Sequence, residues 1–418
     1  MNKGKNNRIS TRTWLIMIVA WLAMAGSQTI TFSYGMMLKD VMVDFGMDYD
    51  LAGLIGSISG IATVLVTIPV ALLAGRFNAK FMVPLCCGLV AAGMLIFGFA
   101  VNIPMLFLGR IVSTTFYNGI TTSLVVVKMR QVPAQQIGGV NGIENFMQPI
   151  GQTVATLCMA QILVAVGGWR NVYTIIGSIM LAMALLWLVL YRETDVNPIP
   201  AQNGQGSDNV KPLATALRQK SFWLVFLGWP WTVLIWVGMF YYWPSYAQGA
   251  LSMTAAQSGF VVGLIPIFSC VASLTAPLLA KKIGYDKPLI WPWGFILPVL
   301  YFMMMQTDNM VLLCLFSALA GYGAYCYVPL LFTTFYKLGL HPKVVSIGTA
   351  MAMTGVALGS ALGSGVVGWL ITAFGGDIRK ALSLCCLAPI VFGVLTIFLP
   401  ERGRKTLERE AKLRKTPQ

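Results

Sequence analysis

Charged residues and histidine are scarce in this sequence. Of its 418 residues only 10% are Asp, Glu, Lys or Arg, one is histidine, and 57% are hydrophobic. A soluble protein of this size cannot hide so much apolar surface, so an ordinary globular fold is excluded. The single histidine, His341, gives no support for a histidine-based metal site or a catalytic triad. We therefore do not expect an enzyme.

The cysteines do not follow the pattern of a disulfide framework or a metal cluster. All eight lie inside apolar runs, at positions 86, 87, 158, 270, 314, 326, 385 and 386. Cysteines of secreted disulfide-rich domains and zinc sites occur instead at short characteristic spacings. We expect no cofactor and no metal ion.

Apolar runs of about 20 residues recur along the whole chain, and each is long enough to cross a bilayer as a helix. No small-residue cleavage site closes the first run, which predicts a retained helix and not a signal peptide. The predicted fold class is all-α: a polytopic membrane protein with twelve transmembrane helices in two pseudo-symmetric six-helix bundles. The predicted spans are 13–37, 51–74, 81–101, 104–127, 137–164, 171–191, 221–246, 255–280, 288–306, 310–335, 345–373 and 380–399.

A polar segment and an internal repeat divide the chain. Residues 192–220 contain Pro, Gly and Asn and predict a cytoplasmic linker between bundles at 1–191 and 221–400, with a basic cytoplasmic tail at 401–418. At a constant offset of 206 residues, Met47 matches Met253 and Gly53 matches Gly259. Two related halves are a common plan of secondary transporters.

The distribution of lysine and arginine predicts the orientation. The net charge of +15 does not indicate nucleic acid, because 24 of the 29 basic residues fall in the two tails and the loops of one side. Four fall on the other side, and Arg110 lies within a span. By the positive-inside rule both termini are cytoplasmic, in a multi-pass protein of the plasma (inner) membrane.

The span 137–164 carries a polar stripe. Its side chains fall on one face of a helix: Asn141, Glu144, Asn145, Gln148 and Gln152. A carboxylate facing lipid costs several kcal/mol, so this face is expected to look onto protein or water. Glu144 is the candidate proton-coupling group, and the four amides are candidate substrate contacts. The alternative is a structural carboxyl that holds helices together.

Several segments together resemble the major facilitator superfamily over roughly residues 13–400. ALLAGRFNAK, residues 71–80, resembles the family's loop motif between helices two and three, with Arg76 and Lys80 kept and the usual acid replaced by Gly75. Lys281 and Lys282 occupy the matching loop of the second half, so these four basic residues form the candidate gating loops. GGWRNVY at 167–173, QPIG at 148–151 and ATALRQKSFWLVFLG before helix seven resemble further family segments.

The resemblance implies two bundles that rock about a central cavity lined by helices one, four, seven and ten. On these helices we select candidate substrate-binding residues: Arg110, Tyr34, Trp229, Trp236, Phe240, Tyr322 and Tyr325. Arg110 suits an anionic substrate, and the helix-seven aromatics suit a ring or a cation. Packing or capping is the alternative for each.

The expected function is therefore secondary active transport of a small organic solute, with protons as the expected coupling ion by the reasoning on Glu144. Two substrate classes stay open, a monocarboxylate and a neutral or aromatic compound. A multiply charged anion is disfavoured, because the second, eighth and eleventh predicted spans carry no lysine or arginine in their interiors. A multidrug-type exporter is the first alternative, and a non-transporting membrane receptor is the second. The expected partners are the lipid bilayer, the solute and protons; nucleic acid is not expected, and the protein is expected to be a monomer.

Overall fold

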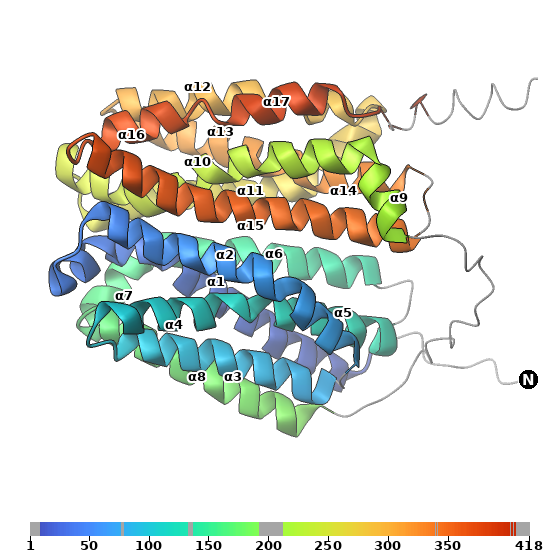
Figure 1. Cartoon of the computed structure of the whole chain (residues 1–418), viewed down its shortest axis with the longest axis horizontal. Helices are drawn as coiled ribbons and strands as arrows, with labels where there is room; N and C mark the ends of the chain where they lie inside the picture. Colours follow the sequence, from blue (N-terminus) through green and yellow to red (C-terminus); the bar gives the residue numbers. More distant parts are fainter. Residues whose placement is uncertain are drawn as a thin grey trace, which may run out of the picture. The chain divides into compact units, whose positions relative to one another are not determined.

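The computed structural model describes residues 9–76, 79–132, 137–191, 212–338, 340, 342–401, 403 and 405–406. Within these residues every regular element is a helix, as Figure 1 shows. The all-α membrane fold predicted from the sequence is confirmed. The chain divides into two compact units, an N-terminal unit of Met1–Phe45 and Ile58–Asp208 and a C-terminal unit of Gly46–Ser57 and Asn209–Gln418.

The N-terminal unit contains seven complete helices and most of an eighth. They are α1 (Thr11–Phe45), the larger part of α2 (Tyr49–Arg76), α3 (Ala79–Gly98), α4 (Ile103–Thr115), α5 (Tyr117–Gln131), α6 (Ile137–Leu157), α7 (Met159–Val166) and α8 (Trp169–Leu190). Helix α1 packs against α6 and α8, and α3 packs against α4 and α8. Because α1 continues to Phe45, it is longer than the predicted span.

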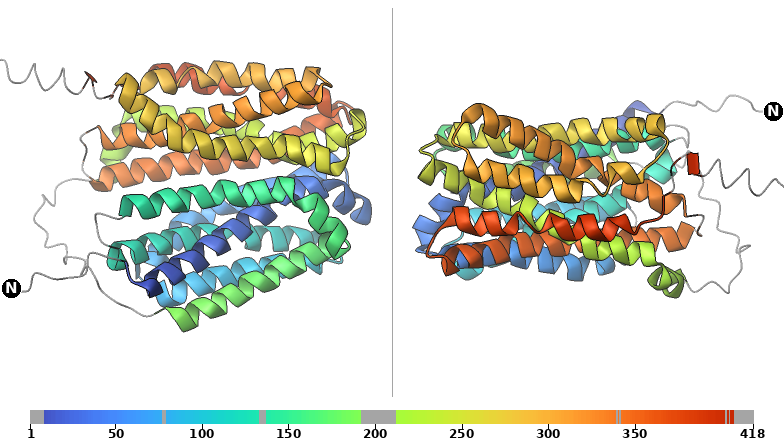
Figure 2. Two further views of the ribbon diagram at one scale, coloured as in Figure 1. Left: turned by 180° about the vertical axis from the view of Figure 1, so that it is seen from behind. Right: turned by 90° about the horizontal axis from the view of Figure 1, so that it is seen from above.

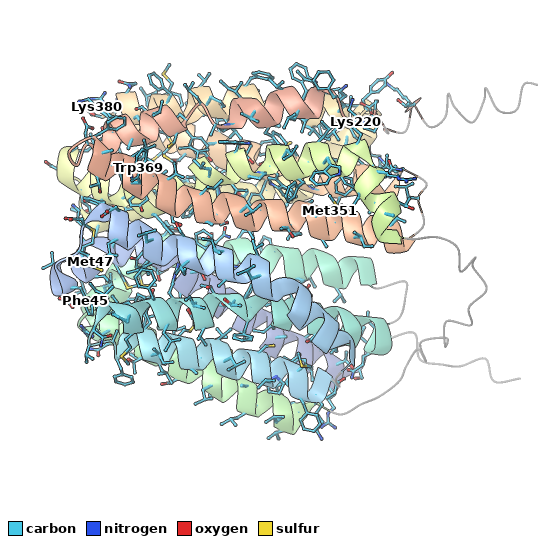
Figure 3. All side chains as sticks on the ribbon, in the orientation of Figure 1. Phe45, Met47, Lys220, Met351, Trp369 and Lys380 are labelled. Atoms are coloured by element: carbon cyan, nitrogen blue, oxygen red, sulfur yellow. The ribbon has the colours of Figure 1, made fainter. Side chains whose placement is uncertain are left out.

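The C-terminal unit contains the remaining elements and the first residues of α2. They are α9 (Pro212–Arg218), α10 (Lys220–Ala250), α11 (Ala255–Ile283), η1 (Lys287–Leu289), α12 (Trp293–Gln306), α13 (Met310–Cys326), α14 (Val328–Tyr336), α15 (Pro342–Ala373), α16 (Ile378–Cys385) and α17 (Pro389–Ile397). Large apolar side chains on their outer faces are exposed; Figure 3 shows one of them, Trp369 on α15, which is 62% exposed.

Nine helices of the described residues are long and apolar enough to cross a membrane, or ten if the bent pair α6 and α7 counts as one. The predicted spans over α2 and α4–α5 contain side chains outside the described set, so a count of twelve stays a prediction. The predicted limits of the linker also stay a prediction, because residues 192–211 lie outside the described part.

Several predicted spans are interrupted, and in three of them hydroxyl side chains or proline explain where the helical ladder is weakened. α6 and α7 meet at 58° near Cys158 (Figure 2), just after Thr153 and Thr156 donate to carbonyls one turn earlier. Ser113 and Thr114 both donate to the Arg110 carbonyl immediately before the break between α4 and α5. Such back-bonding bends helices. Proline interrupts the tenth predicted span, since Pro329 opens α14.

The most extensive helix–helix contact of the C-terminal unit is that between α10 and α15, and glycine residues lie along it. A Cβ atom at Gly359 would lie 2.5 Å from the Pro230 carbonyl oxygen, and one at Gly363 would lie 2.5 Å from that of Leu234. Only glycine allows the two backbones to approach this closely. The stripe at Gly355, Gly359 and Gly363 therefore places α10 directly along α15 (Figure 1).

The start of α2 packs on the opposite small-residue face of α15. The Ser57 hydroxyl donates to the Ala361 carbonyl over 2.8 Å, and a Cβ at Gly53 would lie 2.6 Å from the Ser364 carbonyl oxygen. The Tyr242 hydroxyl of α10 donates to the same Ser364 carbonyl over 2.6 Å. These contacts explain why residues 46–57 belong to the C-terminal unit although the rest of α2 does not.

Helix limits agree with the internal repeat. α2 begins at Tyr49 and α11 begins at Ala255, which are 206 residues apart. The start of α11 is fixed by a capping box in which Thr254 and Gln257 bond each other's backbone N–H groups. Its end is fixed by Gly284 at φ +85°, a left-handed position suited to glycine.

Candidate functional site

Arg110 lies on α4 and is fully buried. Its guanidinium donates to the Thr31 carbonyl of α1 over 2.9 Å and lies 5.0 Å from the centre of the Tyr34 ring. Cation–π stacking and a charge-assisted hydrogen bond both stabilise a buried positive charge. The structure thus brings two of the selected residues, Arg110 and Tyr34, into contact inside the N-terminal unit.

Glu144 lies on α6 and is half-buried. The indole N–H of Trp21 on α1 donates to its Oε2 across a long hydrogen bond of 3.4 Å. Next along the same helix pair, the Thr29 hydroxyl donates to the Gly151 carbonyl over 3.0 Å. Glu144 therefore meets α1 at Trp21, a residue that the sequence did not single out.

The carboxyl and the guanidinium thus contact one helix at two levels. Trp21 and Thr31 are ten residues apart on α1, which corresponds to about 15 Å along the helix axis. This separation of about three turns places the two contacts at different levels of α1. Helix α1 therefore contacts both groups, Glu144 through Trp21 and Arg110 through Thr31.

The other members of the polar stripe are only partly described. Gln152 is 3% exposed, and its Oε1 lacks a hydrogen-bond partner among the described residues. Next to it, Gly151 packs so closely on α1 that a Cβ would lie 2.3 Å from the Ala25 carbonyl oxygen. The side chains of Asn141, Asn145 and Gln148 lie outside the described set, so their roles stay predictions.

Aromatic side chains of the C-terminal unit form a half-exposed group on α10 and α13. The Trp236 ring lies 4.8 Å from that of Phe240 and 6.2 Å from that of Tyr325. Trp236 and Tyr325 are half-buried, whereas Phe240 is buried beneath them. Rings held in this way can stack on a planar group.

Trp229 is another candidate aromatic residue of the C-terminal unit, and it lies in a buried hydrogen-bond network. The Tyr327 hydroxyl donates to Thr232 Oγ1 over 2.8 Å, and the Thr232 hydroxyl donates to the Trp229 carbonyl over 2.9 Å. The Tyr327 ring packs 4.5 Å from Phe392 of α17. Trp229 and Tyr327 are 5% and 2% exposed, so this network joins α10, α13 and α17 inside the unit.

Tyr322 faces a different neighbour from Tyr325. Its hydroxyl lies 3.1 Å from that of Thr275 on α11, and its ring lies 5.9 Å from that of Trp293. The two tyrosines lie three residues apart, on one side of α13, but contact rings of different helices. Sequence alone placed them in one group.

An aromatic chain connects Arg110 to the end of α1. The Tyr34 ring contacts Phe97, which stacks on Tyr173 at 4.3 Å. Beyond them the Trp169 indole N–H donates to Asp44 over 2.9 Å, and Arg170 lies 3.6 Å from the same carboxylate. The sequence GGWRNVY signalled Trp169 and Arg170, but only the structure shows their common partner.

The candidate gating loops differ in how far they are described. The side chain of Arg76 lies outside the described set, and the Lys80 ammonium lies 5.8 Å from the Phe81 ring. Lys281 and Lys282 are exposed in the last turn of α11. Just beyond them Asp286 is buried and bonds Lys337 of α14 over 2.5 Å.

Long apolar helices that bury charged and polar side chains define a multi-pass membrane protein. The sequence matches the Major Facilitator Superfamily over residues 16–339, and the chain belongs to this family. No curated protein is similar enough in sequence to count as a match.

Solved structures of transporters share the fold. A bacterial homologue of the human lysosomal transporter Spinster, in an inward-facing and unoccupied conformation, superposes with a TM-score of 0.74 at 15% identity, covering 93% of this chain and 95% of that one. The nucleoside transporter NupG superposes with a TM-score of 0.71 at 15% identity, covering 93% and 99%. At such identities the likeness concerns the fold alone.

Proposed function

We propose that this protein is a secondary active transporter of a small organic solute, driven by protons through Glu144. Membership of the Major Facilitator Superfamily supports transport across a membrane. The observation that carries the proton-coupling step is the contact of Glu144 with Trp21 on the helix that also holds Arg110. Ionisable groups within membrane spans commonly serve such pathways.

Protonation of Glu144 changes its contact with α1. The ionised carboxylate is a strong acceptor for the Trp21 N–H, whereas the protonated carboxyl is a weaker one. Loading a proton therefore loosens α1 near Trp21, while Thr31 and Tyr34 stay bound to Arg110. A ligand or proton that binds two conformations unequally shifts the balance between them.

The aromatic group supports an uncharged or aromatic solute as the first substrate class. Trp236 and Tyr325 present half-exposed ring surface, which suits a planar group. A monocarboxylate is the second candidate, favoured by the buried positive charge of Arg110. The nucleoside transporter among the structural neighbours adds nucleosides to the compounds worth assaying.

Proton flux in proteoliposomes tests the coupling. Vesicles that contain the protein and a trapped pH indicator are given uridine, benzoate or lactate in separate runs. We expect at least one compound to change the internal pH, and Glu144→Gln to bind that compound while abolishing the change. A pH response of normal size in Glu144→Gln would remove Glu144 from the coupling step.

The rest of the topology follows the distribution of charge. We place both termini and the loop of Lys281 and Lys282 on the cytoplasmic side of the plasma membrane, with the protein acting as a monomer. Twenty-four basic residues on one side support this orientation.

A further inference from the structure

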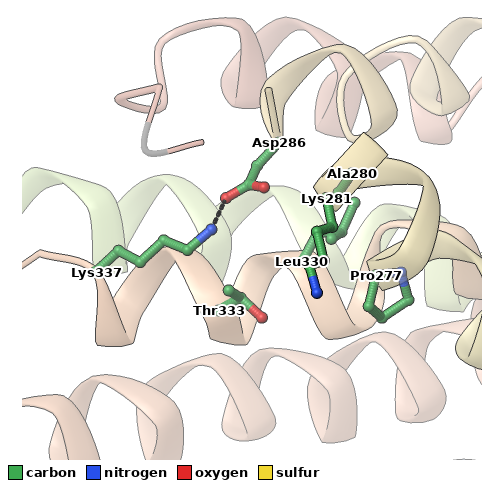
Figure 4. Close-up of a pocket in the computed structure, with 7 residues that line it drawn as sticks. All are labelled: Pro277, Ala280, Lys281, Asp286, Leu330, Thr333 and Lys337. Atoms are coloured by element: carbon green, nitrogen blue, oxygen red, sulfur yellow. Dashed lines mark hydrogen bonds and ion pairs between the residues drawn. The ribbon is translucent and has the colours of Figure 1, made fainter. Parts of the chain in front are cut away.

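A small hollow opens between α11 and α14 beside the loop that joins α11 to η1. Its cavity volume is about 140 Å³. Its polar lining consists of Lys281, Asp286, Thr333 and Lys337, and its apolar lining includes Pro277 and Leu330. Figure 4 shows Lys337 reaching Asp286 while the Lys281 side chain extends along α11 toward α14. This volume is smaller than that of pockets that enclose a whole drug-sized ligand, about 300–1,000 Å³, so the hollow has room for one small group only.

The charges that line the hollow leave one cation in excess. Lys337 neutralises Asp286 over 2.5 Å, and the Asp286 side chain is only 5% exposed. Within the described part of the chain Lys281 makes no ion pair. The Thr333 hydroxyl also lines this space and donates to the Pro329 carbonyl over 2.7 Å. Because a phosphate diester only accepts hydrogen bonds, Thr333 contacts one by turning its O–H from that carbonyl into the hollow.

Residues of the C-terminal segment form hydrogen bonds with the loop beside the hollow. The Glu401 carboxylate accepts the backbone N–H groups of Asp286 and Lys287, each over 3.0 Å. The Lys405 backbone N–H donates to the Gly284 carbonyl over 3.1 Å. The described residues at this end of α11 and in the segments near it thus include two carboxylates, Asp286 and Glu401, and five lysines: Lys281, Lys282, Lys287, Lys337 and Lys405. The positive field of this end favours an anion.

The outer face of α11 leads from the hollow into the apolar region. Leu274 and Leu278 are 58% and 67% exposed. Lys281 follows Leu274 by seven residues, which places the two side chains about 20° apart around the helix. An apolar stripe that ends in a lysine is the arrangement expected where acyl chains lie along a helix and a headgroup lies at its end.

We propose that this hollow binds a phosphate group, with Lys281 as the charged contact and Thr333 as a hydroxyl contact. A phosphate diester of an anionic phospholipid and a free phosphate ion share this chemistry. The exposed leucines of α11 favour the lipid. The site uses none of the candidate transport residues Glu144, Arg110 and Trp236, and it assigns a role to Lys281 beyond gating.

Native mass spectrometry of the purified full chain tests the proposal. The protein in detergent is titrated with dioleoylphosphatidylglycerol, with dioleoylglycerol, which lacks the phosphate, and with inorganic phosphate. Lys281→Gln and Lys282→Gln form a matched pair, because both remove one exposed positive charge from α11 and only Lys281 lines the hollow. Thr333→Val removes the hydroxyl and keeps the shape of the side chain.

We expect the unmodified protein and Lys282→Gln to retain one phosphatidylglycerol about tenfold more tightly than Lys281→Gln does, the size of one charge-assisted hydrogen bond. Thr333→Val is expected to weaken retention by a smaller factor, and dioleoylglycerol is expected not to be retained. If inorganic phosphate displaces the lipid and itself depends on Lys281, the site stands with free phosphate as its ligand. Equal losses in Lys281→Gln and Lys282→Gln, or no loss in Lys281→Gln, would overturn the proposal.

Discussion

At the scale of single residues, the contacts of Arg110 bear on whether it binds substrate or holds helices together. It is fully buried in the N-terminal unit, bonded to the Thr31 carbonyl and stacked on Tyr34. A lysine would keep the charge but lose the planar surface that stacks on a ring and the fork that donates in parallel. Substitution by lysine therefore distinguishes a structural role of Arg110 from a contact with an anionic substrate.

We expect Arg110→Lys to lower the free energy of unfolding by about 1–3 kcal/mol, the range for a buried hydrogen bond to a charged group. Transport of benzoate and of uridine should fall together, because α1 loses its contact with α4. Thermal unfolding and vesicle uptake measure the two effects. Arg170→Lys is the control, since the Arg170 side chain is 41% exposed and should lose less stability. A loss confined to carboxylates would assign Arg110 to the substrate instead.

At the scale of helices, the contact between α10 and α15 depends on glycine at one position above all. A Cβ at Gly359 would lie 2.5 Å from the Pro230 carbonyl oxygen and 2.8 Å from Val233 Cβ. Backbone atoms cannot move aside as a flexible side chain can. The clash should therefore outweigh the gain of about 1 kcal/mol that alanine brings to a helix interior.

We expect Gly359→Ala to destabilise the protein by about 1–3 kcal/mol through overpacking. Gly228→Ala on α10 is the matched control, because its Cβ would meet no atom closer than the Phe392 Cα at 3.4 Å. Thermal unfolding in detergent compares the two. Equal stability of both variants would contradict the role of the glycine stripe.

Helix α16 carries a titratable cap outside the membrane spans. The Asp377 carboxylate accepts the Lys380 backbone N–H over 3.0 Å, and the Lys380 ammonium lies 3.1 Å away. These bonds, the backbone one first, lower the pKa of Asp377 below its usual value of 3.8. Because the folded pKa is depressed, the stabilisation is present above pH 3.8 and is lost as the pH falls through the folded pKa.

Asp377→Asn keeps a capping oxygen but does not titrate. We expect the unmodified protein to be the more stable of the two at pH 7, and the difference to shrink only below pH 3.8. Thermal unfolding between pH 7 and pH 3 measures this. A difference that is constant over the whole range would show that the ionised form of Asp377 contributes nothing.

Sequence patterns predicted the helices well and their interruptions poorly. Runs of apolar residues identified the spans, and the 206-residue repeat agrees with the matching starts of α2 and α11. The bend near Cys158 was not predicted, because it depends on where the Thr153 and Thr156 hydroxyls donate, and those rotamers are set by packing. Similarly, Tyr322 and Tyr325 have the same residue type and close positions, yet their partners come from distant helices that the local sequence does not specify.

At the scale of the whole molecule, the charge asymmetry predicts which parts of the chain face the cytoplasm. Cysteine is introduced at Ser207 in the predicted linker or at Thr307 between α12 and α13, on a Cys158→Ser background because Cys158 is exposed. An impermeant maleimide added to whole cells should label the Thr307→Cys variant and not the Ser207→Cys variant until the membrane is broken. The reverse result would invert the orientation.

The packing of α2 on α15 has an entropic consequence. The surfaces that meet are made of Gly53, Ser57, Ser364 and Gly368, whose side chains have little or no rotamer freedom to lose when they meet or to regain when they part. Separating such surfaces breaks a few hydrogen bonds and shallow van der Waals contacts but disengages no interlocked side chains. Inside the C-terminal unit the start of α2 can therefore slide along α15 at little cost in side-chain entropy.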